Sequence, residues 1–264
     1  MPILETGRDG SLTLKPLAID LYCGLGGWSE GLLAECWEVV GFDIERHCYP
    51  GMGPYPAQLV LQDVLTIHGE QFRGIASLIV ASPPCQFFSR MAMPFKMPWS
   101  QEEYERRKLL AHSLFWAPFR IAHEAQLPLI VENVCGAQKW IGRSRYAYGS
   151  FHLWGDVPAL MPEAVKHRKV GGINLSKVGF NVQACRNLKE RMKSNPGTHD
   201  RTEGPNRPRF IQEGTKMGGG WWNDSTNSLI RKASSRSNAR KMASAAIAKI
   251  PEELARHIAR TFKP

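Results

Sequence analysis

Short apolar runs that alternate with helical segments dominate the first half of the chain, and they constrain its fold more than any other feature. The strand-like runs lie at residues 17–22, 39–43, 59–61, 78–81 and 129–131. Helical spacing covers residues 28–37, and helix formers fill residues 101–124, where we expect Pro118 to interrupt the helix. This alternation predicts an α/β fold with a doubly wound, mostly parallel sheet. Polar residues that follow the strands should then meet at one edge, where such sheets bind ligands.

A glycine-rich turn follows the first apolar run. Gly24, Gly26 and Gly27 would let the backbone approach a ligand closely, and the next helix would offer its free amide groups. Asp43 ends the second run about 20 residues later, where an acid can accept hydrogen bonds from ribose hydroxyls. The turn alone fits a tight connection that binds nothing equally well. Together with Asp43 it favours a nucleotide-type cofactor, whereas Asp63 suits either that site or a helix cap.

Cys85 differs from the other five cysteines because it leaves a buried strand beside Pro83 and Pro84. The prolines fix the backbone geometry and hold the cysteine in a rigid loop. The thiolate is the nucleophilic form of cysteine, and a helix N-terminus or a nearby cation stabilises it. Inert packing is the more common role of a lone cysteine. The position of Cys85 at a strand end favours a nucleophile instead.

Glu132 and Asn133 follow the next apolar strand. Taken alone, the carboxylate is best explained as a helix cap or a surface residue. Coupled to Cys85 from a neighbouring strand, Glu132 would hydrogen-bond a protonated ring nitrogen of a base, as thiol attack on a pyrimidine requires. The two strand ends together therefore favour chemistry on a pyrimidine.

These residues occur in an order that resembles the cytosine-5 DNA methyltransferase family, and most of all its small phage or prophage members. The matching elements are residues 20–27 (DLYCGLGG), 41–43 (GFD), 63–64 (DV), 84–86 (PCQ) and 132–134 (ENV). They cover residues 18 to about 135 of the chain. The resemblance implies a Rossmann-like enzyme that uses S-adenosylmethionine to methylate DNA, within or outside a restriction-modification system.

The resemblance also implies a role for each matching residue. Cys85 would add to carbon 6 of a flipped cytosine while Glu132 contacts N3, so that carbon 5 accepts the methyl group. Flipping is required because carbon 6 is inaccessible inside the base stack. The turn would line the methionine end of the cofactor, Asp43 would bind its ribose, and Asp63 with Val64 would hold its adenine. The implied cofactor contacts are Asp20, Tyr22, Gly24, Gly26, Gly27, Asp43, Ile44, Asp63, Val64 and Pro84.

Two elements of the family match this chain poorly. The family carries Gln-x-Arg-x-Arg on a later strand, and here Arg143 and Arg145 supply only the arginines, at a short distance from Val134. We assign Arg145 to the active site and Arg143 to DNA, with two exposed loop arginines as the alternative. Near the C-terminus, residues 247–248 stand where the family has a Gly-Asn pair.

The variable domain of the family corresponds to residues 158–242, which are strongly basic. Half of the 34 lysines and arginines lie between residues 166 and 241, and the chain carries a formal charge of +10. Such a charge implies an acidic partner, with nucleic acid or an anionic membrane surface as the usual candidates. The resemblance implies that the partner is double-stranded DNA, whose phosphates these residues would neutralise. Trp221 and Trp222 are either base contacts or ordinary packing of a small domain. The expected nucleic-acid contacts are Gln86, Ser89, Arg143, Arg207, Arg209 and Trp221.

We expect a flexible arm at residues 1–15, a catalytic and cofactor-binding domain at 16–157, a target-recognition region at 158–242 and a C-terminal helix at 243–264 that returns to the catalytic domain. No apolar stretch approaches the roughly 20 residues that cross a bilayer. The cysteines are scattered without C-x-x-C pairs, which argues against a zinc site or a disulfide framework. The expectation is a monomeric, metal-free, cytoplasmic protein of a bacterial or phage-infected cell.

Three other functions fit parts of the sequence. Some relatives of the family methylate transfer RNA with the same fold and chemistry. A dinucleotide oxidoreductase would suit the glycine turn but leaves Cys85 and Glu132 unexplained. A catalytically inactive nucleic-acid-binding homologue would keep the basic charge and lose the reaction.

Overall fold

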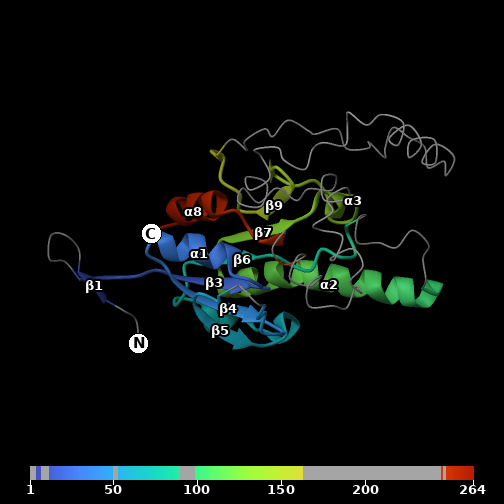
Figure 1. The fold of residues 1–264 in the computed structure, drawn as a ribbon, viewed down its shortest axis with the longest axis horizontal. Coiled ribbons are helices and arrows are strands. Elements are labelled where there is room, and N and C mark those ends of the chain that lie inside the picture. Colours follow the sequence, from blue (N-terminus) through green and yellow to red (C-terminus); the bar gives the residue numbers. More distant parts are fainter. Residues whose placement is uncertain (1–3, 7–11, 50–52, 90–98, 163–244, 246–247) are drawn as a thin grey trace, which may run out of the picture. The chain divides into compact units, whose positions relative to one another are not determined.

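A computed structural model gives the fold of the chain (Figure 1). It describes residues 4–6, 12–49, 53–89, 99–162, 245 and 248–264. Most of the expected target-recognition region lies outside these residues, and so do Arg207, Arg209, Trp221 and Trp222. Met1–Val165 and Lys249–Pro264 belong to one compact unit, and the fold described below is that of its described residues.

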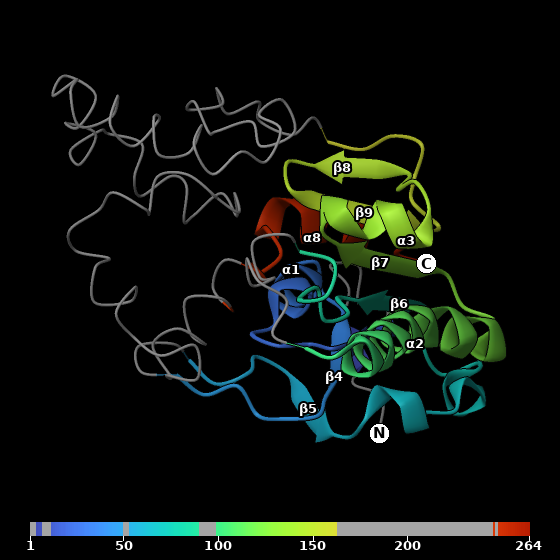
Figure 2. The same ribbon diagram turned by 90° about the vertical axis from the view of Figure 1, so that its right-hand side faces the viewer.

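A seven-stranded sheet forms the centre of this unit (Figure 2). Its strands are β3 (Leu17–Leu21), β4 (Glu38–Asp43), β5 (Gln58–Leu61), β6 (Leu78–Ala81), β7 (Leu129–Asn133), β8 (Tyr146–Tyr148) and β9 (Phe151–Gly155). They lie in the order β5-β4-β3-β6-β7-β9-β8. The first five of these run parallel, and β9 is antiparallel to both of its neighbours. The prediction of an α/β fold with a doubly wound, mostly parallel sheet is confirmed.

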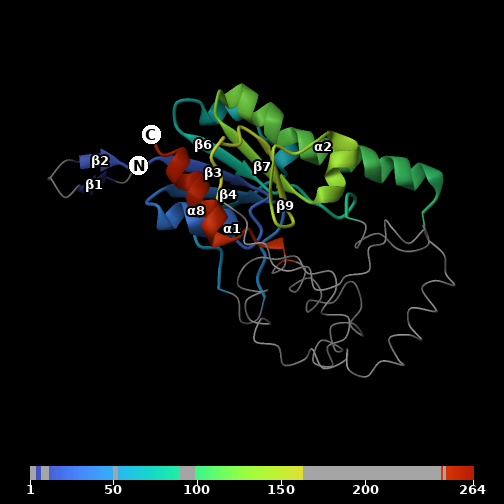
Figure 3. The same cartoon turned by 90° about the horizontal axis from the view of Figure 1, so that it is seen from above.

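Helices cover both faces of the sheet (Figure 3). α1 (Gly27–Ala34) and α8 (Glu252–Thr261) lie on one face, and α2 (Gln101–Ala125) lies on the other. The connections contain the short helical turns η1 (Val64–Thr66), η2 (Gly69–Phe72), η3 (Cys135–Ala137) and α3 (Gln138–Ile141). Successive side chains of the central strands point into two apolar cores, one under α2 and one under α1 and α8. Both faces are buried, which is why these strands read as continuous apolar runs.

Helix α1 is shorter than the spacing of residues 28–37 predicts. It follows Gly26, whose φ of 77° is in the left-handed region that favours glycine, and it ends at Ala34. Cys36 has a φ of 61° and turns the chain out of the helix. The last apolar residue of the pattern, Trp37, is buried, and its Nε1 donates a hydrogen bond to the carbonyl of Ala259 at 3.1 Å. The expected end of this helix was wrong because Trp37 packs from the connection instead.

Helix α2 runs through Pro118 without interruption, contrary to the prediction from sequence. Ser100 caps its start by accepting a hydrogen bond from the Glu103 amide at 3.2 Å. Proline has no amide hydrogen to donate to the residue four positions earlier, which is Leu114. The hydroxyl of Tyr22 donates to the Leu114 carbonyl at 2.8 Å instead. A side chain from the glycine turn thus replaces the hydrogen bond that Pro118 removes.

The N-terminal segment contains regular structure that we did not predict. We expected residues 1–15 to form a flexible arm. Strands β1 (Leu4–Thr6) and β2 (Leu12–Leu14) instead pair antiparallel, with Leu4 opposite Leu14. Runs of three residues are too short to show a period in the sequence.

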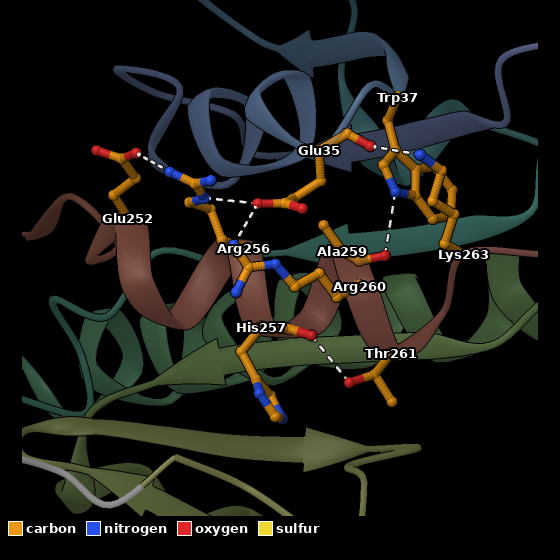
Figure 4. Close-up of polar contacts among 9 residues, drawn as sticks. All are labelled: Glu35, Trp37, Glu252, Arg256, His257, Ala259, Arg260, Thr261 and Lys263. Atoms are coloured by element: carbon orange, nitrogen blue, oxygen red, sulfur yellow. Dashed lines mark hydrogen bonds and ion pairs between the residues drawn. The ribbon is translucent and has the colours of Figure 1, made fainter. Parts of the chain in front are cut away.

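Charged residues around Glu35 join α8 to the end of α1 (Figure 4). Glu35 Oε1 accepts hydrogen bonds from Arg260 Nη2 at 2.8 Å and from Arg256 Nε at 2.6 Å. Lys263 Nζ donates to the backbone carbonyl of Glu35 at 3.0 Å. The two arginines lower the pKa of the Glu35 carboxyl to about 2. The last helix is therefore held against α1 by ion pairs as well as by its apolar face.

Candidate active site

The glycine turn after β3 is tied to the acid at the end of β4. Tyr22, Gly24 and Gly26 all have positive φ, so the chain bends sharply at this point. The Gly24 amide donates to Asp43 Oδ2 at 2.9 Å, and the Glu45 amide lies 3.3 Å from Oδ1. Burial alone would raise the pKa of Asp43, but hydrogen bonds from His47, Gly24 and Glu45 outweigh it and lower that pKa. The carboxylate is thus ionised and oriented at the edge of the sheet.

The glycine turn beside this carboxylate is closely packed at Gly26 and Gly27 but open at Gly24. A methyl group built on Gly24 would meet nothing closer than 3.9 Å, whereas one on Gly26 would lie 2.6 Å from Pro56 Cδ and one on Gly27 would lie 2.5 Å from the Ile250 amide nitrogen. Gly26 and Gly27 therefore let the chain pack closely. Gly24 borders open space next to Asp43.

Ile44 supplies an apolar surface at the same edge. It follows Asp43 directly, and it is 74% exposed, which is unusual for a large aliphatic side chain beside a buried strand. An acid at the end of such a strand is suited to accept hydrogen bonds from ribose hydroxyls, and an exposed aliphatic side chain is suited to pack on a flat ring. The residues present fit a nucleoside cofactor at Gly24, Asp43 and Ile44.

A buried polar cluster lies beneath the turn. Ser29 Oγ donates to Asp20 Oδ2 at 2.6 Å and lies 2.5 Å from the hydroxyl of Tyr55. Asp20 is fully buried, and its Oδ1 has no hydrogen-bond partner among the described residues. Burial raises the pKa of Asp20 to about 7, against the lowering effect of the Ser29 hydrogen bond. Sequence reasoning missed Ser29 and Tyr55, because neither lies in a recognisable motif.

Three other predicted cofactor residues have structural contacts of their own. The Tyr22 hydroxyl is bonded to α2, as described above. Asp63 Oδ1 accepts a hydrogen bond from the Leu65 amide at 2.9 Å and so caps η1, which was the alternative reading of this acid. Val64 is buried in the core under α2. Whether any of them also contacts a cofactor stays a prediction.

Cys85 begins a turn just beyond β6. The amides of Phe88 and Ser89 donate to its carbonyl at 3.0 and 2.9 Å. The Cys85 side chain is partly exposed, with the exposed residues Pro84 and Gln86 on either side of it. Cys85 is therefore not fully buried.

Asn133, at the end of β7, contacts the segment that leads into the Cys85 turn. The Asn133 side-chain nitrogen donates to the Pro83 carbonyl at 2.9 Å, and this hydrogen bond is fully buried. Its oxygen accepts from the Val134 amide at 2.9 Å. The two candidate chemical groups thus flank one hydrogen bond, with Glu132 next to the donor and Cys85 two residues after the acceptor.

Glu132 belongs to the face of the sheet that α1 covers. Only 4% of Glu132 is exposed. It lies two residues after Ile130 and so points to the same face of the sheet, and the Ile130 side chain lies in the core under α1 and α8. Because Ala81, the last residue of β6, pairs with Val131, Ser82 follows β6 at about the level of Glu132. Ser82 Oγ accepts a hydrogen bond from Trp28 Nε1 at 3.0 Å. The carboxyl group is therefore held in a largely dry environment at the strand end.

The two predicted arginines follow α3 in an exposed turn. The backbone amide of Arg145 donates to the carbonyl of Leu153 on β9 at 2.8 Å, and Leu153 pairs with Glu132. Arg145 thus directly precedes β8. Because β9 lies between β8 and β7, the backbone of Arg145 is two strand spacings, or about 10 Å, from β7. The structure does not place Arg145 beside Glu132 in the sheet, although both lie at the same level. A catalytic role for Arg145 stays a prediction.

The segment that precedes α8 packs against the start of α1. Lys249 Nζ donates to Glu30 Oε1 at 2.6 Å, and Ile250 contacts Gly27. The segment at residues 249–250, near the C-terminal end of the sequence, therefore lies next to the glycine turn.

No group of three or more His, Cys, Asp or Glu residues in the described part of the chain is arranged to hold a metal ion. None of the described helices is both long and apolar enough to span a bilayer.

No protein-family model and no curated protein matches the chain. Solved structures are similar to part of it. At 24% identity and a TM-score of 0.33, 48% of this chain aligns with 35% of a protein described as a DNA modification methyltransferase encoded within an E. coli prophage. The same share aligns with 37% of the Dnmt2 methyltransferase of S. pombe, at 19% identity and a TM-score of 0.33. A third alignment joins 53% of the chain to 71% of the 16S rRNA (adenine(1408)-N(1))-methyltransferase of Catenulisporales acidiphilia, at 17% identity and a TM-score of 0.25.

The aligned part spans less than half the length of the first two of these proteins. TM-scores at this level carry no argument about reaction or substrate.

Proposed function

We propose that this chain is an S-adenosylmethionine-dependent DNA methyltransferase that modifies carbon 5 of cytosine, with Cys85 as its covalent nucleophile. The observation that carries the proposal is the buried hydrogen bond between Asn133 and Pro83. It fixes the Cys85 turn to the strand end that bears Glu132. A thiol and a carboxyl group at adjacent strand ends are what addition to a pyrimidine ring requires.

The cofactor would lie at the edge formed by Gly24, Asp43 and Ile44. Asp43 would accept hydrogen bonds from the ribose hydroxyls, because its carboxylate is ionised and lies at the end of β4. Ile44 would pack on the adenine ring. Asp20, buried beneath the turn, would support the turn from below. When bound, S-adenosylmethionine would supply an electrophilic methyl group.

The reaction would proceed through a thioether to the base. Cys85 Sγ, as the thiolate, forms a bond to carbon 6 of the flipped cytosine while Glu132 holds a proton at N3, so that the electron pair of the 5,6 double bond moves to carbon 5. Carbon 5 would then accept the methyl group, and S-adenosylhomocysteine would be the product left behind. Loss of the carbon 5 proton to solvent then restores the double bond and expels the thiolate. Every atom added to the base except the methyl group leaves again.

The partner follows from the distribution of charge. Residues 158–242, proposed as the target-recognition region, hold most of the positive surplus of a chain with a formal charge of +10. Lysines and arginines there would bind phosphates without reading the sequence. The enzyme would act as a monomer on duplex DNA in a bacterial or phage-infected cell.

Bisulfite sequencing of DNA from cells that express the chain tests the proposal. We expect protected cytosines in a defined sequence context, and none with Cys85→Ser. Purified protein with tritiated S-adenosylmethionine should label duplex DNA. Label in transfer RNA alone would replace DNA by RNA as the substrate, and unchanged labelling by Cys85→Ser would refute the covalent mechanism.

A further inference from the structure

Trp140 of α3 lies against the turn that holds Cys85. Its ring centroid is 5.7 Å from that of Phe87 and 6.0 Å from that of His112 on α2. A methyl group built on Gly136 would lie 2.0 Å from the Phe88 carbonyl oxygen, so the backbone before α3 also touches this turn. The surface around Trp140 is therefore fixed in position next to the candidate nucleophile.

Cations gather on and beside the Trp140 ring. Lys139 Nζ is 4.8 Å from its centroid and Lys108 Nζ is 6.0 Å from it, both within the range of cation–π attraction. Arg143 is exposed in the turn that follows. Residues 134–155 contain no acid. Within the described part of the chain, neither Lys139 nor Arg143 forms an ion pair, whereas Lys108 is paired with Glu105 at 2.9 Å.

The turn that carries Arg143 is held by its own hydrogen bonds. The amide and hydroxyl of Ser144 both lie 3.2 Å from Gln138 Oε1. The same hydroxyl lies 2.9 Å from His152 Nδ1 on β9. The backbone that carries this cation is thus held in place, which reduces the backbone entropy lost when it binds a ligand.

We propose that the Trp140 surface, defined as Lys108, Lys139, Trp140 and Arg143, binds the sugar-phosphate backbone of duplex DNA beside the flipped base. This inference rests on the proposed function, because it takes the substrate to be DNA. A base that reaches Cys85 carries its flanking phosphates with it. Lys139 and Arg143, which are exposed and form no ion pair within the described part of the chain, are the cations that those phosphates require.

The experiment measures duplex DNA binding by the full chain without methyl donor, by fluorescence anisotropy over a series of salt concentrations. Lys139→Gln should weaken binding several-fold and reduce the slope of log affinity against log salt by about 0.9, the value for one lost phosphate contact. Lys139→Gln with Arg143→Gln should reduce it by about twice as much. The matched control is Arg73→Gln, an exposed cation next to η2, which packs on the other end of α2.

Unchanged slopes in both variants, or an equal loss in the Arg73→Gln control, would overturn the proposal. A slope change with labelled transfer RNA but not with duplex DNA would overturn the choice of DNA. These outcomes distinguish a failure of the Trp140 surface from a failure of the proposed function. If the wild-type chain methylates DNA while the slopes stay unchanged, only the proposal about the Trp140 surface is rejected. If the slopes change but the wild-type chain transfers no methyl group, only the proposed reaction is rejected.

Discussion

Asn133 on β7 donates a buried hydrogen bond of 2.9 Å to the carbonyl of Pro83, fifty residues earlier in the chain. The same side chain accepts from the amide of Val134. One asparagine thus satisfies polar backbone groups from two strand ends at once. It also sets the distance between the turn of Cys85 and the strand of Glu132.

We expect Asn133→Ala to lower kcat for DNA methylation at least tenfold while the KM for S-adenosylmethionine changes little. The variant leaves the buried Pro83 carbonyl and the partly buried Val134 amide without this partner, so the free energy of unfolding should also fall by about 1–3 kcal/mol. Steady-state kinetics and urea unfolding measure both effects. Gln62→Ala, which removes an exposed amide bonded to Thr66, is the control. Equal losses in kcat and in cofactor affinity would contradict a positioning role.

Tyr22→Phe tests whether the tyrosine hydroxyl serves the helix or the cofactor. Since it replaces the donor that Pro118 lacks, we expect the free energy of unfolding to fall by about 1–2 kcal/mol with little change in the Kd for S-adenosylmethionine. Tyr49→Phe, which removes a hydroxyl 3.3 Å from His47 Nδ1, serves as the control. A large loss of cofactor affinity with unchanged stability would return Tyr22 to the cofactor site.

The central strands could be predicted from the sequence because both of their faces are buried. Such strands appear as continuous apolar runs, and the residues at their ends must meet at one edge. Contacts between distant segments could not be predicted in the same way. The packing of Pro56 on Gly26 and the bond from Tyr22 to Leu114 each depend on the folded path of a connection that carries no periodic signal.

Asp20→Asn should change the dependence of stability on pH. Burial raises the pKa of Asp20 from 3.8 to about 7, so the folded protein holds this proton where the unfolded chain has lost it. The contribution to stability is therefore complete below about pH 4 and is lost as the pH rises to about 7. At pH 8 the asparagine variant should be more stable by roughly 1–3 kcal/mol, with a smaller difference at pH 4. Unfolding in urea at several pH values measures this, and an identical pH profile in both proteins would contradict it.

Glu35→Gln tests the junction between α1 and α8. The two arginines lower the pKa of Glu35 to about 2, so its contribution is present above about pH 4.5 and is lost as the pH falls toward 2. We expect a loss of about 1 kcal/mol at pH 7 that disappears in acid. Thermal unfolding at both pH values measures it, with Glu102→Gln on α2 as an exposed control. A loss that persists at pH 2 would show that packing, not charge, holds the helix.

Covalent trapping tests the central claim most directly. In duplex DNA that contains 5-fluorocytosine, carbon 5 carries no proton to lose, so the bond from sulfur to carbon 6 should persist after methyl transfer. We predict a denaturant-resistant complex that needs S-adenosylmethionine, is absent in Cys85→Ser, and maps to Cys85 by mass spectrometry. The absence of a complex with the wild-type chain on DNA that it methylates, or a complex that maps to the exposed Cys135, would contradict the account.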